Sequence, residues 1–234
     1  MIGFLVRLAL LCGMAGPASA GAWPREAGTG FASLTRWQAQ DSAESYTALF
    51  LEYGVLPRLT LGLDAGRSVS GQTKAVVFAR VPFGRLMGGL AAAELGWGEI
   101  AGRPVLRPGL SLGYSVARAP WQGWLAVDTL IELDMETRQM DVKADITLGL
   151  TPQRHGAPPS DWTLMLQVQT GLVAVQDSLY LLQTEGTVPE PSFLRIVPSI
   201  TYQLRDGLHL ELGLYRALDG SSEQGVKLGL WSRF

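Results

Sequence analysis

An all-β fold is predicted by the residue pattern near the end of the chain and by the distribution of hydrophobic residues. Leucine or valine stands at every second position in residues 208–214 and again in 226–230, which is the period of a β-strand and not of a helix. Charged residues make up 17% of the chain, against roughly 25% in ordinary soluble domains. The mean hydropathy is +0.16 although no long apolar segment follows residue 20. The sequence therefore predicts a single antiparallel transmembrane β-barrel of about 12 strands.

A secretory signal peptide is predicted at residues 1–20, ahead of one barrel domain at residues 21–234. The first residues carry one arginine, an apolar stretch follows, and Ala18-Ser19-Ala20 provides the small residues of a cleavage site. The alternative, a membrane anchor, needs roughly 18 apolar residues in a row, and glycines and a proline interrupt this stretch. Cleavage after Ala20 would remove Cys12, the only cysteine, and with it any disulfide or cysteine-ligated metal.

Strand-like segments of about ten residues, the length that a tilted strand needs to cross a bilayer, follow one another along the rest of the chain. The alternation of apolar with polar or small residues is regular at 59–64 and 142–149 and less regular at 29–38 and 73–82. A polar turn at 218–224 makes the last two segments a hairpin. An even number of strands places both chain ends on the same side of a membrane. The expected strands are 29–38, 45–55, 59–68, 73–82, 89–98, 105–116, 124–135, 139–150, 162–175, 193–204, 208–217 and 224–234.

The lengths of the connections distinguish the two ends of this barrel. With Phe234 at the periplasmic rim, the short connections fall on the periplasmic side, as is usual for outer-membrane barrels. These turns are 55–58, 83–88 and 205–207. The longer connection 151–161 falls on the same side, and 176–192 becomes the main extracellular loop. Tryptophans near strand ends are expected in interfacial girdles, with core packing as the alternative for each. They are Trp23, Trp37, Trp97, Trp121, Trp124 and Trp162.

The main structural alternative is a soluble up-and-down barrel, in which the apolar face of each strand points inward and a charged face meets water. Here the second face of the strands is rich in glycine and poor in lysine, which suits a crowded, curved interior better than a solvent-exposed surface. The glycines on that face are Gly62, Gly66, Gly96, Gly98, Gly109, Gly113, Gly149, Gly171, Gly213 and Gly229. Together with the signal peptide, this composition favours the membrane barrel.

The same alternation predicts which polar residues line the lumen, where charges of both signs occur in similar numbers. The candidates are Glu52, Asp64, Lys74, Arg80, Glu94, Arg107, Asp128, Glu132, Asp134, Asp141, Lys143, Asp145, Arg195, His209, Glu211, Lys227 and Arg233. Glu211 is expected to face Lys227 across the last hairpin. Two interpretations of the set remain open. Either a salt-bridge network closes the lumen, or the charges line a path for solutes.

The hairpin over 124–150 carries the densest group of these charges. A turn near 136–139 would place Glu132 opposite Lys143, which is a plausible cross-strand ion pair. The same register would place Asp134 opposite Asp141, where two like charges repel unless a cation or a proton relieves them. Two carboxylates are too few for Ca²⁺, which takes six or more oxygen ligands. No metal and no cofactor are therefore predicted.

Two features resemble known protein families. The terminal aromatic residue, Phe234, resembles the assembly signal of Gram-negative outer-membrane β-barrels, although Ser232 stands where such signals usually have an apolar residue. The segments 52–64 (EYGVLPRLTLGLD) and 21–24 (GAWP) resemble the meta-pathway phenol-degradation-like outer-membrane barrels. These resemblances imply a location in the outer membrane, contact with its lipids, insertion by the barrel-assembly machinery, and passage of small solutes.

The predicted function is that of a passive conduit or uptake channel for small solutes, hydrophobic or aromatic ones included. A formal net charge of -2 without a basic run gives no reason to expect nucleic acid. One alternative is a structural barrel with a salt-bridged, closed lumen. The other is a lipid-hydrolysing barrel enzyme in which His209 activates a serine on a neighbouring strand, such as Ser199. No recognisable motif surrounds either residue, and no catalytic residue is assigned.

Overall fold

The computed structural model describes residues 21–118, 120–153, 158–175, 192–219 and 221–234. The predicted signal peptide and nearly all of the expected extracellular loop 176–192 lie outside these residues. Within them, no helix is long and apolar enough to cross a membrane.

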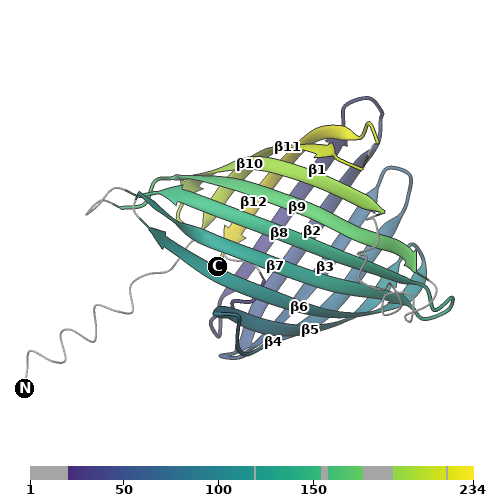
Figure 1. Cartoon of the computed structure of the whole chain (residues 1–234), viewed down its shortest axis with the longest axis horizontal. Helices are drawn as coiled ribbons and strands as arrows, with labels where there is room; N and C mark the ends of the chain where they lie inside the picture. The colour runs from purple at the N-terminus through teal and green to yellow at the C-terminus, as the bar shows by residue number, and fades with distance from the viewer. Residues whose placement is uncertain (1–20, 119, 154–157, 176–191, 220) are drawn as a thin grey trace, which may run out of the picture.

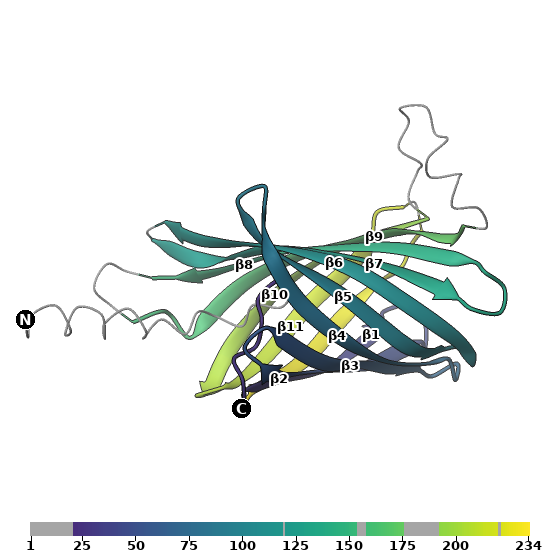
Figure 2. The same ribbon diagram turned by 90° about the horizontal axis from the view of Figure 1, so that it is seen from below.

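The described chain folds into one closed antiparallel barrel in which each strand pairs with the next and β1 pairs with β12. The strands are β1 (Gly30–Ala39), β2 (Ser45–Leu56), β3 (Leu59–Ser68), β4 (Thr73–Leu86), β5 (Gly89–Ile100), β6 (Arg103–Arg118), β7 (Trp121–Asp134), β8 (Met140–Pro152), β9 (Trp162–Val175), β10 (Phe193–Arg205), β11 (Leu208–Ala217) and β12 (Gln224–Arg233). They run obliquely around an elongated barrel (Figures 1 and 2). The predicted fold class and the 12 strands are confirmed.

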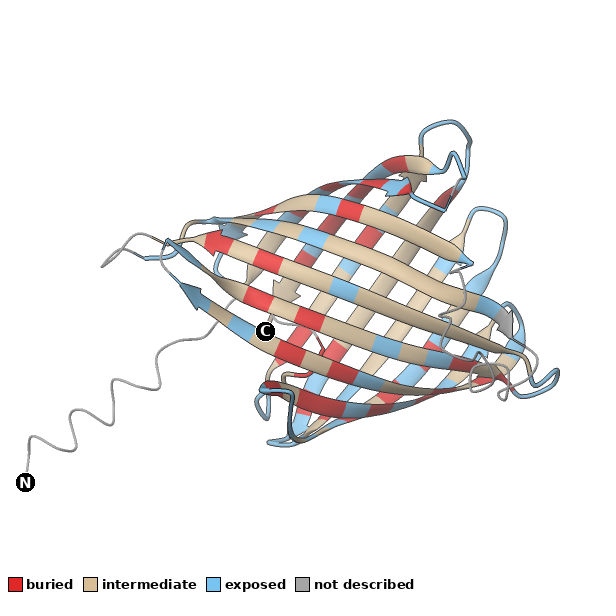
Figure 3. Ribbon diagram, in the orientation of Figure 1, coloured by how far each residue is buried: buried red, intermediate tan, exposed pale blue. Residues whose placement is uncertain are grey.

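The strand alternation separates an apolar outer surface from a polar interior. On β11, Leu210, Leu212 and Leu214 are exposed, whereas Glu211 and Tyr215 between and beside them are buried. Exposed leucine, valine and isoleucine side chains recur on every strand from β3 to β7, and buried and exposed positions alternate along the ribbons (Figure 3). A soluble barrel would place its apolar face inside. The structure places it outside, as a membrane barrel requires.

The end of the barrel that holds Phe234 carries tight turns, shorter than the sequence suggested because strands extend further than expected. β4 continues to Leu86, so that Met87 and Gly88 alone make the turn to β5. Both residues have positive φ, 52° and 85°, which is the backbone of a two-residue hairpin turn matched to strand twist. β7 likewise begins at Trp121, where the sequence suggested residue 124.

The register of the β7–β8 hairpin differs from the expected one by two residues. Glu132 lies opposite Asp141 and not opposite Lys143, and Asp134 is not paired with Asp141. The reason lies in the turn: the Asp134 carboxylate accepts hydrogen bonds from the backbone N–H groups of Glu136 and Thr137, at 2.8 and 3.0 Å. This capping makes Asp134 part of the turn, which therefore begins earlier in the chain than expected.

The six tryptophans expected in girdles divide into two groups. Trp97, Trp121 and Trp162 are exposed on the outer surface, at 64%, 36% and 47% of their full area. The other three are inside the barrel and contradict the expectation: Trp124 is buried, Trp37 lines the lumen, and the Trp23 ring lies against Gly113. Their inward positions follow from the strand alternation, which places Trp124 on the same face as Asp128.

Candidate functional site

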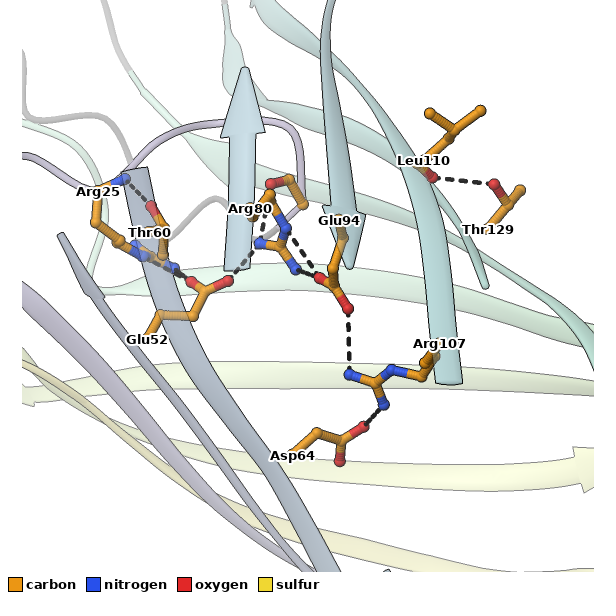
Figure 4. A network of polar contacts seen from close by, with 10 residues as sticks. Arg25, Glu52, Thr60, Asp64, Arg80, Glu94, Arg107, Leu110 and Thr129 are labelled. Carbon is orange, nitrogen blue, oxygen red and sulfur yellow. Dashed lines mark hydrogen bonds and ion pairs between the residues drawn. The ribbon is translucent and has the colours of Figure 1, made fainter. Parts of the chain in front are cut away.

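A continuous chain of ion pairs crosses one side of the lumen, and it is built from alternate cations and anions on the segment before β1 and on strands β2 to β6 (Figure 4). Glu52 on β2 binds Arg25, at 2.5 Å, and also binds Arg80 on β4. The second guanidinium nitrogen of Arg80 lies 2.7 Å from Glu94 on β5, whose other oxygen is 3.2 Å from Arg107 on β6. Because these groups are buried, each charge depends on its neighbour for compensation.

The chain of ion pairs continues towards the opposite end of the barrel through Asp64 on β3. Arg107 lies 2.5 Å from one Asp64 oxygen, and Lys74 on β4 lies 2.9 Å from the other. Arg107 is only 1% exposed although it carries a charge. Its burial is possible because two carboxylates and the ring of Phe78, 5.8 Å from the guanidinium carbon, surround it. We call these seven residues the ion-pair network; in the order of their contacts they are Arg25, Glu52, Arg80, Glu94, Arg107, Asp64 and Lys74.

Two of the ion pairs outside the network join residues on adjacent strands of one hairpin. Glu211 on β11 is fully buried beneath Lys227, 2.7 Å away, and also accepts a hydrogen bond from the Trp231 indole at 3.1 Å. The expected contact between Glu211 and Lys227 is therefore present, although Lys227 lies directly opposite Gly213. Glu132 binds Lys143 diagonally in the same way. Each pair links residues two register positions apart, a separation that long side chains readily span.

Residues 21–28 precede β1, and the first part of this segment, 21–25, lies inside the barrel, whereas 26–28 are exposed at the rim. The Gly21 carbonyl accepts a hydrogen bond from Arg80 at 3.1 Å, and the Arg25 backbone N–H donates to the Thr60 hydroxyl at 3.1 Å. Gly28 N–H then bonds the Gly54 carbonyl at 2.8 Å, next to the start of β1. Ala22 is completely buried. This segment, here called the N-terminal plug, runs from the middle of the lumen to the rim that holds Phe234.

A cavity of about 640 Å³ occupies the other half of the lumen. It begins among the turns at the rim opposite Phe234, where Ser42 and Glu44 contribute, and it reaches down to Gly21 of the N-terminal plug. Aromatic side chains from β1, β2 and β11 form part of its wall. They are Trp37, Tyr46, Phe50 and Tyr215. The cavity is therefore a vestibule with a partly aromatic wall and a charged floor.

The structure distributes the predicted lumen residues over different places. Glu52, Asp64, Glu94 and Arg107 belong to the ion-pair network. The cavity is lined by Asp64, Glu94, Arg107, Asp128, Asp145, Arg195 and Lys227. A separate cleft of about 90 Å³ near the β7–β8 turn includes Glu132, Asp134 and Asp141. Lys143 and Glu211 are found in ion pairs outside the network.

The proposed pairing of His209 with Ser199 is wrong. His209 on β11 lies opposite Gln203 of β10, whereas Ser199 lies opposite Gly213, four positions further along the strand. On its other side His209 faces Trp231. Among the residues that the structure describes, no group of three or more histidine, cysteine, aspartate or glutamate side chains is placed to hold a metal ion.

Sequence reasoning missed Arg25 and the aromatic wall of the cavity. Arg25 lies before the first strand, where alternation gives no information, so its position depends on the tertiary contact with Glu52. Trp37 and Tyr215 were accessible to the alternation argument, since they share a strand face with Thr35 and Glu211. The general tendency of tryptophan to lie at the membrane interface pointed the other way and was given more weight for Trp37.

No protein-family model and no curated protein matches this chain. Solved structures of several barrels do. The KdgM porin is 7% identical with a TM-score of 0.55, covering 88% of this chain and 99% of its own. The NanC porin is 10% identical with a TM-score of 0.57, covering 86% and 98%. An outer membrane channel from Pseudomonas putida F1 is 12% identical with a TM-score of 0.53, covering 94% and 98%. The likeness shows that this chain shares the fold of these barrels.

Proposed function

We propose that this protein is a passive outer-membrane channel for small solutes. The observation that carries the proposal is the cavity of about 640 Å³, which reaches from one rim to the middle of a closed barrel with an apolar outer surface. Such a barrel places a polar lumen across a bilayer without exposing a sheet edge to lipid. The names of the neighbours, two porins and an outer membrane channel, support the same class of function.

The proposed location is the outer membrane of a Gram-negative bacterium, reached through export by a cleaved signal peptide. The exposed apolar residues would contact membrane lipids, and exposed aromatic residues near the Phe234 rim, among them Tyr53, Phe83 and Trp162, would lie at the interface. Phe234 is 66% exposed at the seam between β1 and β12. That exposure leaves it accessible to the barrel-assembly machinery.

The proposed solutes are small and poorly polar, aromatic ones included. The cavity wall supports this choice because Trp37 and Tyr215 pack edge to face, 5.4 Å apart, and present aromatic surface beside Phe50. Cations that could attract an acidic solute are already engaged: Lys227 with Glu211, and Arg195 with Glu223 at 2.7 Å. The KdgM porin has been solved in complex with disordered oligogalacturonate, so an acidic solute is the alternative outcome.

Liposome swelling measures both the channel and its preference. Phenylalanine and glutamine are compared because both are zwitterions that cross bilayers poorly and differ in the side chain. We expect phenylalanine to enter at least as fast as glutamine, and Trp37→Ala to slow phenylalanine severalfold by removing aromatic wall. Leu34→Ala, on the outer face of the same strand, serves as the control. The aromatic preference would be contradicted if glutamine entered faster than phenylalanine and if Trp37→Ala left both rates unchanged.

The second candidate function is a structural barrel with a closed lumen. The ion-pair network and the N-terminal plug favour it, because the N-terminal plug lies in the lumen between the cavity and the Phe234 rim and is held there by Glu52 and Arg80 of the network. In the swelling experiment this candidate predicts no entry of either amino acid above the rate of empty liposomes. That result would overturn the channel proposal. The register of His209 and Ser199 gives lipid hydrolysis no support.

A further inference from the structure

Two half-buried aspartates in the middle of the lumen lack the paired cation that the buried glutamates of the barrel have. Asp128 on β7 lies directly opposite Asp145 on β8. Among the described residues, neither carboxylate forms a salt bridge, whereas Glu52, Glu94 and Glu211 all do. Asp145 accepts a hydrogen bond from Gln167 at 3.4 Å, but Oδ1 of Asp128 is buried without any hydrogen-bond partner. A buried carboxylate oxygen in this state requires a donor.

Gly21 of the N-terminal plug lies against that unpartnered oxygen. A side-chain carbon built on Gly21 would be 2.6 Å from Oδ1 and 3.1 Å from Oδ2 of Asp128. The tetrahedral geometry of Cα therefore places the Gly21 nitrogen within roughly 5 Å of the carboxylate. The Arg80 guanidinium fixes Gly21 here through its carbonyl, at 3.1 Å.

We infer that Asp128 is the binding site for the α-ammonium group that cleavage between Ala20 and Gly21 creates. In the precursor the Gly21 nitrogen is a neutral peptide nitrogen. Hydrolysis of the Ala20–Gly21 bond consumes one water, leaves a carboxylate on Ala20, and gives Gly21 a protonated amine. That amine supplies a positive charge and three donors beside two carboxylates that form no salt bridge among the described residues. A residue larger than glycine would clash with Asp128 at this position.

The inference rests on the proposed cleavage of the signal peptide, but it is independent of the channel function and holds for an open or a closed barrel. It gives the ion-pair network a final member: the α-ammonium fastens the inner end of the N-terminal plug to β7, as Arg25 fastens its outer half to β2. Processing at Ala20 and seating of the N-terminal plug thereby become linked events.

The test uses mature protein purified from outer membranes and labelled with a small acylating reagent near neutral pH. Free α-amino groups are less basic than lysine side chains and react first under these conditions. Mass spectrometry of the N-terminal peptide gives the first residue and the labelling rate. We expect the chain to start at Gly21 and to label at least about tenfold more slowly when folded than when unfolded, because the ion pair holds the amine protonated.

Asp128→Asn should bring the labelling rate of the folded protein close to that of the unfolded protein, and Asp145→Asn should leave it slow. Heat-dependent gel mobility verifies that each variant is folded. If Asp128→Asn does not fold, one serine inserted before Gly21 moves the amine away from Asp128 and should give the same rapid labelling. A mature chain that begins elsewhere, or equal rates in wild type and Asp128→Asn, would overturn the inference.

Discussion

At the scale of single residues, the lumen is organised by glycines that make room for aromatic rings. The Phe78 ring lies over Gly62, the Tyr46 ring over Gly66, and the Trp124 ring over Gly149. A side-chain carbon on Gly149 would be 2.3 Å from the Trp124 ring. The sequence predicted that glycines occupy the inner face, and these contacts supply the reason: large rings fill a narrow barrel only where the facing residue has no side chain.

Gly149→Val should therefore destabilise the barrel by about 3 kcal/mol, because the new side chain displaces the buried Trp124 ring. The free energy of unfolding is measured by urea titration in lipid vesicles, with the heat-dependent gel shift as readout. Ala144→Val, on the lipid-facing side of the same strand, provides a matched control that should change little. Equal stability of the two variants would show that Trp124 does not require this glycine.

The ion-pair network leads to a second prediction at this scale. Glu94→Gln should lower the free energy of unfolding by about 3 kcal/mol, because Arg80 and Arg107 then share too little negative charge in a buried site. Glu44→Gln, an exposed residue at the rim, is the control and should change the stability by less than about 0.5 kcal/mol. The same urea titration measures both. If Glu94→Gln left the urea midpoint of unfolding unchanged, water would have to stabilise the positive charges of Arg80 and Arg107 in place of the carboxylate.

At the scale of strands, periodicity predicted most of the fold. Every expected strand is present, with bounds within a few residues, because apolar alternation is imposed directly by the difference between lipid and lumen. Cross-strand register was less accessible. In β7–β8 it depends on how Asp134 caps the turn, which alternation does not report. The N-terminal plug was inaccessible for a related reason: its position is set by contacts of Gly21 and Arg25 with distant strands.

The seam between β1 and β12 provides the prediction for this scale. Phe234 and Gly30 exchange backbone hydrogen bonds at 2.5 and 3.1 Å, and the Phe234 ring lies against Gly30. Phe234→Ala should reduce the amount of heat-shifted barrel in isolated outer membranes severalfold, because the proposed assembly signal is lost. Leu230→Ala, an outward residue of the same strand, should assemble normally. Normal assembly of Phe234→Ala would show that assembly does not require the terminal aromatic residue.

At the scale of the whole molecule, the barrel is divided into two halves of different character. The half near the opposite rim holds the open cavity, and the half near Phe234 holds the N-terminal plug, with the ion-pair network running between them from Arg25 to the cavity floor. A solute that enters the cavity therefore meets Gly21, Arg80 and Glu94 before it reaches the other side. In this account, the N-terminal plug limits the flow through the channel.

Single-channel conductance in planar bilayers tests this central claim most directly. Trp23→Ala combined with Arg25→Ala removes the ring packed on Gly113 and the ion pair to Glu52, which should loosen the N-terminal plug while leaving the barrel wall intact. The account predicts a small conductance for the mature protein and a severalfold larger one for the double variant. Equal conductance in both proteins, or none in either, would contradict a channel limited by its N-terminal plug.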